Sequence, residues 1–344
     1  MTSVPEGGDR THLEVRRLGT QAGESLPVKE VGRALVRLWA GGARPGENRI
    51  VRACQGNLIV WDADSRDNSF EGSLEAMARI RPARIILLEG AAAGSPLLAR
   101  ISALCHAREN GERVCCEKIA LPLLSGIEDR TASATRSLLR GDVPVLLWCP
   151  AEPPFGLAPF VDLCDDADSL LVDSAGFEDT RAGLRRLLHL QQAARGLHLL
   201  DWTWRRLREW RRAVANGFDP PPVRARIPAL RKITIELTAT HGSGIPAVVL
   251  LLAGWIAGAL KRADLAPRLR VAAEEAVPPG RIRRLEFAFT SGPPLEIALA
   301  SPLEIEENLP AELAEFLGRR APDRTYEESL GAAVKHEGVF EGEA

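Results

Sequence analysis

The sequence predicts an α/β protein of two domains, each built on a mostly parallel sheet flanked by helices. Its 344 residues are enough for two ordinary domains. Its composition, 45% hydrophobic and 26% charged, is typical of a folded globular protein. Short apolar runs also alternate with amphipathic runs along most of the chain. This alternation favours parallel strands joined by helices that cover both faces of a sheet.

The first half of the chain supplies most of this alternation. A helix is expected over 26–40, because Val31, Leu35 and Leu38 recur at helical spacing before a pair of glycines. Strands are then expected at 57–61, 84–88, 113–121 and 143–148, with helices at 70–80, near 97–109 and at 129–139.

The second half continues with a strand at 169–172, a helix at 180–194, a strand at 232–239 and a hairpin of 283–290 with 295–300. Between them, residues 242–260 carry no charge. The apolar part of this stretch is shorter than the roughly 20 residues that a bilayer core requires, so we expect a buried helix and no membrane span. Gly254 and Gly258, four residues apart, would let a neighbouring element approach that helix closely.

The segment 200–212 is the most distinctive part of the chain, with three of the seven tryptophans and five arginines. Trp204, Leu207, Trp210, Val214 and Phe218 recur at helical spacing, which predicts an amphipathic helix with Asp201 as its N-cap. One interpretation is a helix packed on the core with a solvated basic face. The other is a docking surface, since Trp and Arg are enriched at interface hot spots. Its candidate contact residues are Trp202, Arg205, Arg206, Arg208, Trp210, Arg211 and Arg212.

The pattern Asp-x-x-Trp-x-Arg-Leu-x-x-Trp-Arg, from Asp201 to Arg211, resembles the signature of the OpcA family of glucose-6-phosphate dehydrogenase assembly proteins. Three upstream blocks, 113–119, 137–148 and 167–174, resemble family blocks and follow in family order. The resemblance implies a non-catalytic partner that helps to assemble or activate glucose-6-phosphate dehydrogenase.

The resemblance also implies where the two domains meet, near the proline-rich stretch 150–159. We therefore expect an N-terminal extension and helix at 1–45, an N-terminal α/β domain at 46–156, a C-terminal α/β domain at 157–330 and an acidic tail at 331–344. The triple proline at 220–222 is then a rigid turn inside the second domain.

Charge and cysteine content limit the classes of partner and compartment. The 44 basic and 46 acidic residues nearly cancel, so no overall attraction to nucleic acid or to an anionic membrane is expected. The first ten residues lack the basic start and apolar core of an export signal, which predicts a cytoplasmic protein. The six cysteines show no paired C-x-x-C spacing and are expected to be reduced, with Cys115 and Cys116 facing opposite sides of a strand.

The sequence offers no persuasive catalytic constellation. The six histidines lack metal-ligand spacing, and the Rossmann-like alternation has neither a Walker A loop nor a G-x-G-x-x-G or G-x-S-x-G motif. We therefore expect no metal, no cofactor and no enzyme activity. Two groups near predicted helix starts could hold an anion, although helix capping is their ordinary explanation. They are Arg130, Thr131, Ser133 and Arg136, and His241 with Ser243.

We therefore interpret the chain as a cytoplasmic assembly factor and allosteric activator of glucose-6-phosphate dehydrogenase, in the oxidative pentose phosphate pathway. The first alternative is an enzyme or sensor of phosphorylated metabolites that uses the two candidate anion groups, and a metabolite effector of the complex would use the same groups. The second alternative is a nucleic-acid-binding protein that uses the arginine face of 200–212, against which the balanced charge argues.

Overall fold

The computed structural model describes residues 25–40, 50–63, 70–91, 98–109, 112–124, 126, 128–194, 196–238, 244–262, 264–265, 267–272, 281–299, 308–335 and 342–343. The chain forms two compact units. The first contains residues 1–150, 156–170 and 308–320, and the second contains 151–155, 171–307 and 321–344. A segment from near the C-terminus therefore belongs to the first unit.

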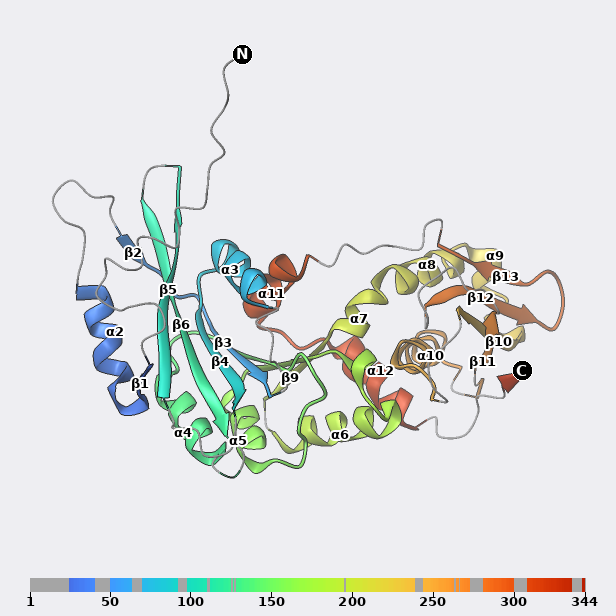
Figure 1. Ribbon diagram of the computed structural model, residues 1–344. Coiled ribbons are helices and arrows are strands. Elements are labelled where there is room, and N and C mark those ends of the chain that lie inside the picture. The colour runs from blue at the N-terminus through green and yellow to red at the C-terminus, as the bar shows by residue number, and fades with distance from the viewer. Residues whose placement is uncertain are drawn as a thin grey trace, which may run out of the picture. The chain divides into compact units, whose positions relative to one another are not determined.

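A mostly parallel sheet is the framework of the first unit (Figure 1). Among the described residues the sheet has nine strands in the order β1-β5-β6-β4-β3-β7-β8-β9, and β2 pairs with β6. The strands are β1 (Ser25–Pro27), β2 (Ile50–Arg52), β3 (Asn57–Asp62), β4 (Arg84–Ala91), β5 (Leu98–Ala107), β6 (Arg113–Leu124), β7 (Val145–Trp148), β8 (Ser169–Val172) and β9 (His198–Asp201). β8 begins in the first unit and ends in the second, and β9 belongs to the second. This architecture confirms the predicted α/β class.

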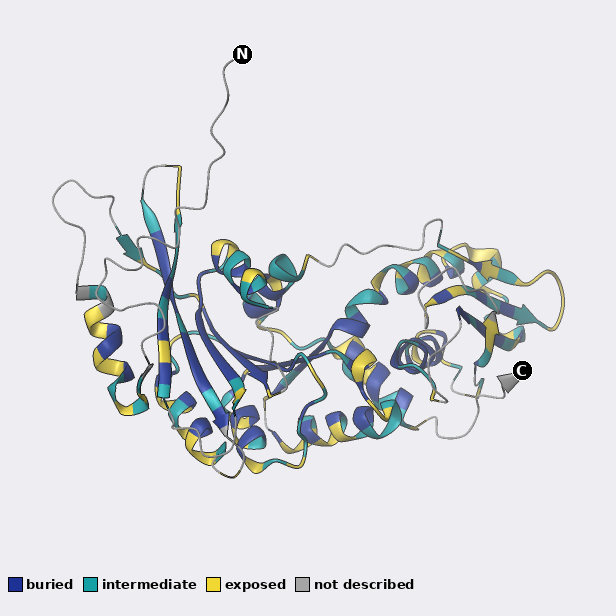
Figure 2. Ribbon diagram, in the orientation of Figure 1, coloured by how far each residue is buried: buried dark blue, intermediate teal, exposed yellow. Residues whose placement is uncertain are grey.

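Helices cover both faces of this sheet, which explains why its central strands are almost wholly apolar (Figure 2). All six residues of β3 and all four of β7 are buried. On one face lie α3 (Glu71–Ile80) and α11 (Leu309–Gly318), and on the other lie α4 (Glu128–Leu138) and α5 (Ala158–Asp166). Edge-to-face ring pairs join each layer to the sheet: Phe70 packs on Trp148, and Phe160 packs on Trp61.

The helix predicted near 97–109 is wrong, because this segment is strand β5, which pairs antiparallel with β6. The burial of its side chains follows a period of two: Ala99, Ile101 and Ala103 are buried, whereas Arg100 is exposed. A hydrophobic face every second residue suits a strand, and the segment pairs with β6 along its length.

The same error concealed a disulfide bond. The antiparallel register places Cys105 directly opposite Cys115, and the two are bonded. The expectation that all six cysteines are reduced is therefore wrong for this pair, because only the pairing of β5 with β6 brings the two sulfurs together. Cys116 faces away from Cys115 and is free, as are Cys54, Cys149 and Cys164.

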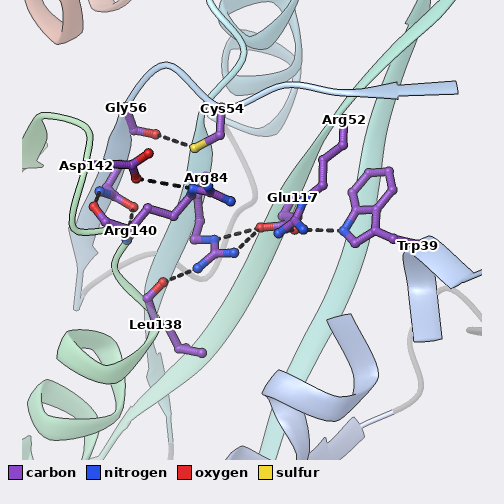
Figure 3. A network of polar contacts seen from close by, with 10 residues as sticks. Trp39, Arg52, Cys54, Gly56, Arg84, Glu117, Leu138, Arg140 and Asp142 are labelled. Atoms are coloured by element: carbon purple, nitrogen blue, oxygen red, sulfur yellow. Dashed lines mark hydrogen bonds and ion pairs between the residues drawn. The ribbon is translucent and has the colours of Figure 1, made fainter. Parts of the chain in front are cut away.

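A buried carboxylate beside this disulfide ties the outer elements of the first unit to its sheet (Figure 3). Glu117 of β6 is 3% exposed. It accepts hydrogen bonds from the Trp39 indole of α2 (Val31–Ala40) at 2.7 Å and from Arg84 Nε of β4 at 2.7 Å, and it forms an ion pair with Arg52 of β2. Arg84 also donates to the carbonyl of Leu138. The charge of Glu117 is thus matched by donors on three other elements.

The second unit contains a mixed sheet of order β13-β12-β10-β11-β14. Its strands are β10 (Leu230–Thr238), β11 (Arg268–Ala272), β12 (Ile282–Phe289), β13 (Leu295–Ile297) and β14 (Gly342–Glu343). The pairing of β12 with β13 confirms the predicted hairpin. Its helices are α6 (Thr180–Ala193), α7 (Trp202–Arg206), α8 (Arg208–Phe218), α9 (Pro221–Arg224), α10 (Ala247–Leu260) and α12 (Arg324–Lys335), with the 3-10 turns η3 (Ser174–Gly176) and η4 (Ile227–Ala229).

The amphipathic helix predicted after Asp201 is divided into α7 and α8, which meet at Leu207. Leu207 has φ −73° and ψ −4°, at the margin of helical geometry, so α7 ends before it and α8 begins at the next residue. The predicted stripe is buried all the same, and Phe218 stacks edge-to-face on Phe287 of β12 at 5.0 Å between ring centroids.

The predicted apolar helix is α10, whose 14 residues include ten that are buried. No helix among the described residues is long and apolar enough to cross a bilayer. The cytoplasmic location stays a prediction. Gly254 supports the close approach expected of it, since a Cβ added there would lie 2.4 Å from the Ser329 carbonyl oxygen of α12. At Gly258 the same atom would meet nothing within 4 Å, so the expectation is wrong for that glycine.

These two glycines allow a matched test of helix packing. Gly254→Ala should lower the free energy of unfolding by about 1–3 kcal/mol, because α12 must move away from α10. Gly258→Ala should raise it by about 0.5–1 kcal/mol, because alanine loses less backbone entropy in a helix. Urea unfolding of both variants checks the pair. Equal effects at the two positions would contradict the contact between α10 and α12.

The disulfide makes stability dependent on reductant. Closing a loop of about ten residues should contribute about 2–3 kcal/mol, so reductant should lower the unfolding midpoint of the wild-type chain. The double variant Cys105→Ser/Cys115→Ser is the control and should unfold at the lower midpoint with or without reductant. Identical wild-type midpoints in the two conditions would contradict a stabilising disulfide.

Candidate functional site

The carboxylate of Asp201 lies at the carboxyl end of β9, where it connects three separate segments of the second unit. It is 2% exposed. Its Oδ1 accepts hydrogen bonds from the backbone N–H of Thr203 at 2.8 Å and of Ser174 at 3.2 Å. Its Oδ2 accepts from the Tyr326 hydroxyl at 3.0 Å. Asp201 therefore caps α7, as predicted, and also binds η3 and α12.

Burial makes Asp201 an unusual acid. Its pKa is raised to about 6, chiefly because the carboxyl is removed from water. The negative charge of Asp173 contributes to the rise, whereas the hydrogen bonds from Ser174 and Thr203 oppose it. The pKa of Tyr326 lies well above its ordinary value, first because the hydroxyl is buried and then because it faces Asp201.

Trp204 is the second fixed point of this region. Its indole N–H donates to Asp323 Oδ2 at 3.1 Å, and its ring lies 5.6 Å from that of Tyr326. The guanidinium carbon of Arg211 lies 3.4 Å from the centroid of the Trp204 ring, and Arg211 also donates to the Trp204 carbonyl at 2.8 Å. The pKa of Arg211 is lowered to about 10, chiefly because the guanidinium is buried. The positive charges of neighbouring arginines lower it as well, whereas the negative charge of Asp323 opposes the shift. α7, α8 and the start of α12 are thereby joined.

A third set of contacts joins α7 to the end of β8. Asp173 receives two hydrogen bonds from Arg206, at 2.9 and 2.8 Å, and one from the Thr203 hydroxyl at 3.0 Å. Both side chains of the ion pair are about a quarter to a third exposed, at 25% and 31%. This two-point geometry fixes the orientation of the Arg206 side chain.

The structure separates the candidate docking residues into an inner and an outer group. Trp202 and Trp210 are buried at 6% and 8% exposure, so neither is an exposed anchor in this structure. Arg206 and Arg211 make the contacts described above, and Arg205 is half-buried with a partner of its own. Arg208 and Arg212 are the two that are exposed.

The first candidate anion group lies on α4, where two of its four members have ordinary structural partners. Thr131 is buried and donates to the Pro122 carbonyl at 2.9 Å, and Arg136 forms an ion pair with Asp166. Arg130 and Ser133 are exposed. The second group, His241 and Ser243, lies outside the described residues.

The described residues contain no cluster of three or more His, Cys, Asp or Glu side chains that could hold a metal ion. The acids around Asp201 instead accept hydrogen bonds from N–H and O–H groups at fixed positions. This chemistry builds a rigid junction.

Sequence reasoning missed the two C-terminal members of the junction, Asp323 and Tyr326. A signal was present, since Asp323 is an N-cap-type residue whose Oδ1 accepts from the backbone N–H of Tyr326, three residues later. That pattern would have predicted α12. It would not have predicted the pairing with Asp201, which is 125 residues away in sequence.

Two family models match the chain in succession. The glucose-6-phosphate dehydrogenase subunit N-terminal domain matches residues 74–189, and the corresponding C-terminal domain matches residues 197–330. These two matches, in this order, place the chain in one class of protein, that with the two domains of the glucose-6-phosphate dehydrogenase subunit models. The chain belongs to the OpcA family, as the resemblance of its four blocks indicated.

Curated relatives are similar over part of their length. A protein of Nostoc punctiforme named "Putative OxPP cycle protein OpcA" is 32% identical over 47% of this chain and 34% of its own length. A Synechocystis protein of the same name is 27% identical over 72% of this chain and 51% of its own length. The chain therefore spans about half or less of these relatives. A solved structure entitled "Trehalose-6-phosphate from E. coli bound with UDP-2-fluoro glucose" is 9% identical, and the match covers 64% of this chain and 64% of that one. Its TM-score of 0.23 is too low to support any argument.

The four blocks that resemble the family are also the junctions of the fold. Glu117, in the first block, holds Arg84, which donates to the Leu138 carbonyl in the second. Asp168, in the third block, accepts from the Val145 N–H at 2.7 Å in the second. The third and fourth blocks meet where Asp201 accepts from Ser174, as described above. The motifs therefore have a structural basis.

The raised pKa of Asp201 predicts a defined pH dependence. Because the folded-state pKa of about 6 exceeds the ordinary 3.8, the folded protein holds this proton more tightly. Protonated Asp201 thus stabilises the fold at low pH. Its contribution to the free energy of unfolding, about 3 kcal/mol, is lost as pH rises from about 4 to above 6. Asp201→Asn cannot titrate, so the wild-type advantage over this variant should shrink across that window.

Urea unfolding at pH 4.5, 5.5 and 7.0 measures this difference. Asp201→Ala is the control, because it should be destabilised by about 1–3 kcal/mol relative to Asp201→Asn at every pH through unpaired buried donors. A constant difference between wild type and Asp201→Asn from pH 4.5 to 7.0 would show that Asp201 is ionised throughout.

Proposed function

We propose that this protein is a non-catalytic partner that binds glucose-6-phosphate dehydrogenase and promotes its active oligomer. The observation that carries the proposal is the ordered match to both glucose-6-phosphate dehydrogenase subunit domains, over 74–189 and 197–330. The two matches cover β4 to β9 of the mostly parallel sheet and β10 to β13 of the mixed sheet.

Linkage supplies the physical mechanism. A partner that binds the active oligomer more tightly than the inactive form shifts the equilibrium by the difference in binding free energy. A difference of roughly 3 kcal/mol corresponds to about a hundredfold shift. Such a partner needs a rigid surface and no reacting groups of its own.

The chemistry of the candidate site supports a non-catalytic role. Asp201, Asp173 and Glu117 each accept several hydrogen bonds from groups of the chain itself, which leaves them committed to the fold. The metabolite-binding alternative draws no support from α4, where Thr131 and Arg136 have internal partners. The formal net charge of −2 gives no support to the nucleic-acid alternative.

Activity and hydrodynamic measurements test the proposal together. Adding the purified chain at micromolar concentration to the dehydrogenase of the same organism should raise its activity or stabilise it, and the two proteins should co-elute at a larger apparent mass. The chain alone should not reduce NADP with glucose 6-phosphate. Unchanged dehydrogenase activity with separate elution would reject the proposal, as would turnover by the chain alone.

A further inference from the structure

The family signature presents different chemistry on the inner and outer faces of α8. Trp210, Val214 and Phe218 are buried on the inner face. Arg208 and Arg212, four residues apart, are exposed on the outer face. Figure 2 shows buried and exposed residues alternating along this helix.

The segment that contains this outer face is rich in basic residues, and some of them have acidic partners within the chain. Residues 202–232 contain nine Lys and Arg but only two Asp and Glu, whereas the whole chain has a formal net charge of −2. Arg212 is 73% exposed, and its ion pair with Glu209 is long, at 3.9 Å. Among the described residues no salt bridge is recorded for Arg208, and its positive charge acts on Arg211 nearby.

The outer face is also held in position before any partner binds. The buried residues of α8, the stacking of Phe218 on Phe287 and the contact of Arg211 with Trp204 anchor the helix on its inner side. Charges on a rigid helix form new ion pairs at a smaller cost in conformational entropy than charges on a loop.

We propose that Arg208 and Arg212 form a docking surface for an acidic patch on the dehydrogenase, an inference that rests on the proposed function. The chain has a formal net charge of −2, whereas proteins that bind a polyanion such as nucleic acid usually carry an excess of positive charge. The partner is therefore expected to be a protein. An acidic patch opposite two arginines would instead neutralise charge locally and fix orientation. The buried tryptophans support this surface from within.

The chain contains a matched control for this surface. Arg33 and Arg37 of α2 are also exposed and also four residues apart, but they lie in the first unit. Charge reversal can therefore be compared at two helices with the same residue types and the same spacing. Circular dichroism melting curves verify that each variant folds.

The test measures the affinity of the full-length chain for the dehydrogenase at several salt concentrations. Arg208→Glu/Arg212→Glu should weaken binding at least tenfold and reduce its salt dependence, whereas Arg33→Glu/Arg37→Glu should stay within about twofold of wild type. Wild-type affinity in a folded Arg208→Glu/Arg212→Glu variant would overturn the docking surface and leave the proposed function standing. Absence of binding by the wild-type chain would overturn both. Retention of the wild type, but not of this variant, on duplex DNA or phosphatidylserine vesicles at physiological salt would overturn the choice of a protein partner.

Discussion

The second unit depends on a single buried carboxylate. Asp201 accepts hydrogen bonds from two backbone N–H groups and from the hydroxyl of Tyr326, which lies 125 residues from Asp201 in sequence. A buried acceptor left without such donors would cost more than any one hydrogen bond contributes. The position of α7, and with it the positions of Trp204 and Arg206, follows from this constraint.

Glu117 has the corresponding position in the first unit. It draws Trp39, Arg52 and Arg84 to one strand, and Arg84 extends the connection to the end of α4. In both units the polar residues of the four family blocks join separate elements through hydrogen bonds. Buried polar networks of this kind hold the elements in one specific arrangement. The blocks therefore define a scaffold whose outer surface remains available for other roles.

The interpretation of the tryptophan and arginine segment changes accordingly. Pattern alone allowed either a core helix or a docking surface, and the structure shows which residues of the segment are buried and which are exposed. The tryptophans, Arg206 and Arg211 are used within the fold, while Arg208 and Arg212 face outward. The proposed partner contact is therefore limited to the two outer arginines.

The sequence by itself determined the α/β class, the central strands β3, β4 and β7, and the buried helix α10, because continuous apolar runs bounded by turns act locally. It also determined the cap at Asp201, which depends on neighbours two residues away. Only the tertiary structure decided that β5 is a strand, that Cys105 meets Cys115, and that Tyr326 reaches Asp201. These outcomes depend on pairing between segments distant in sequence, and no local periodicity encodes which distant segment will supply the partner.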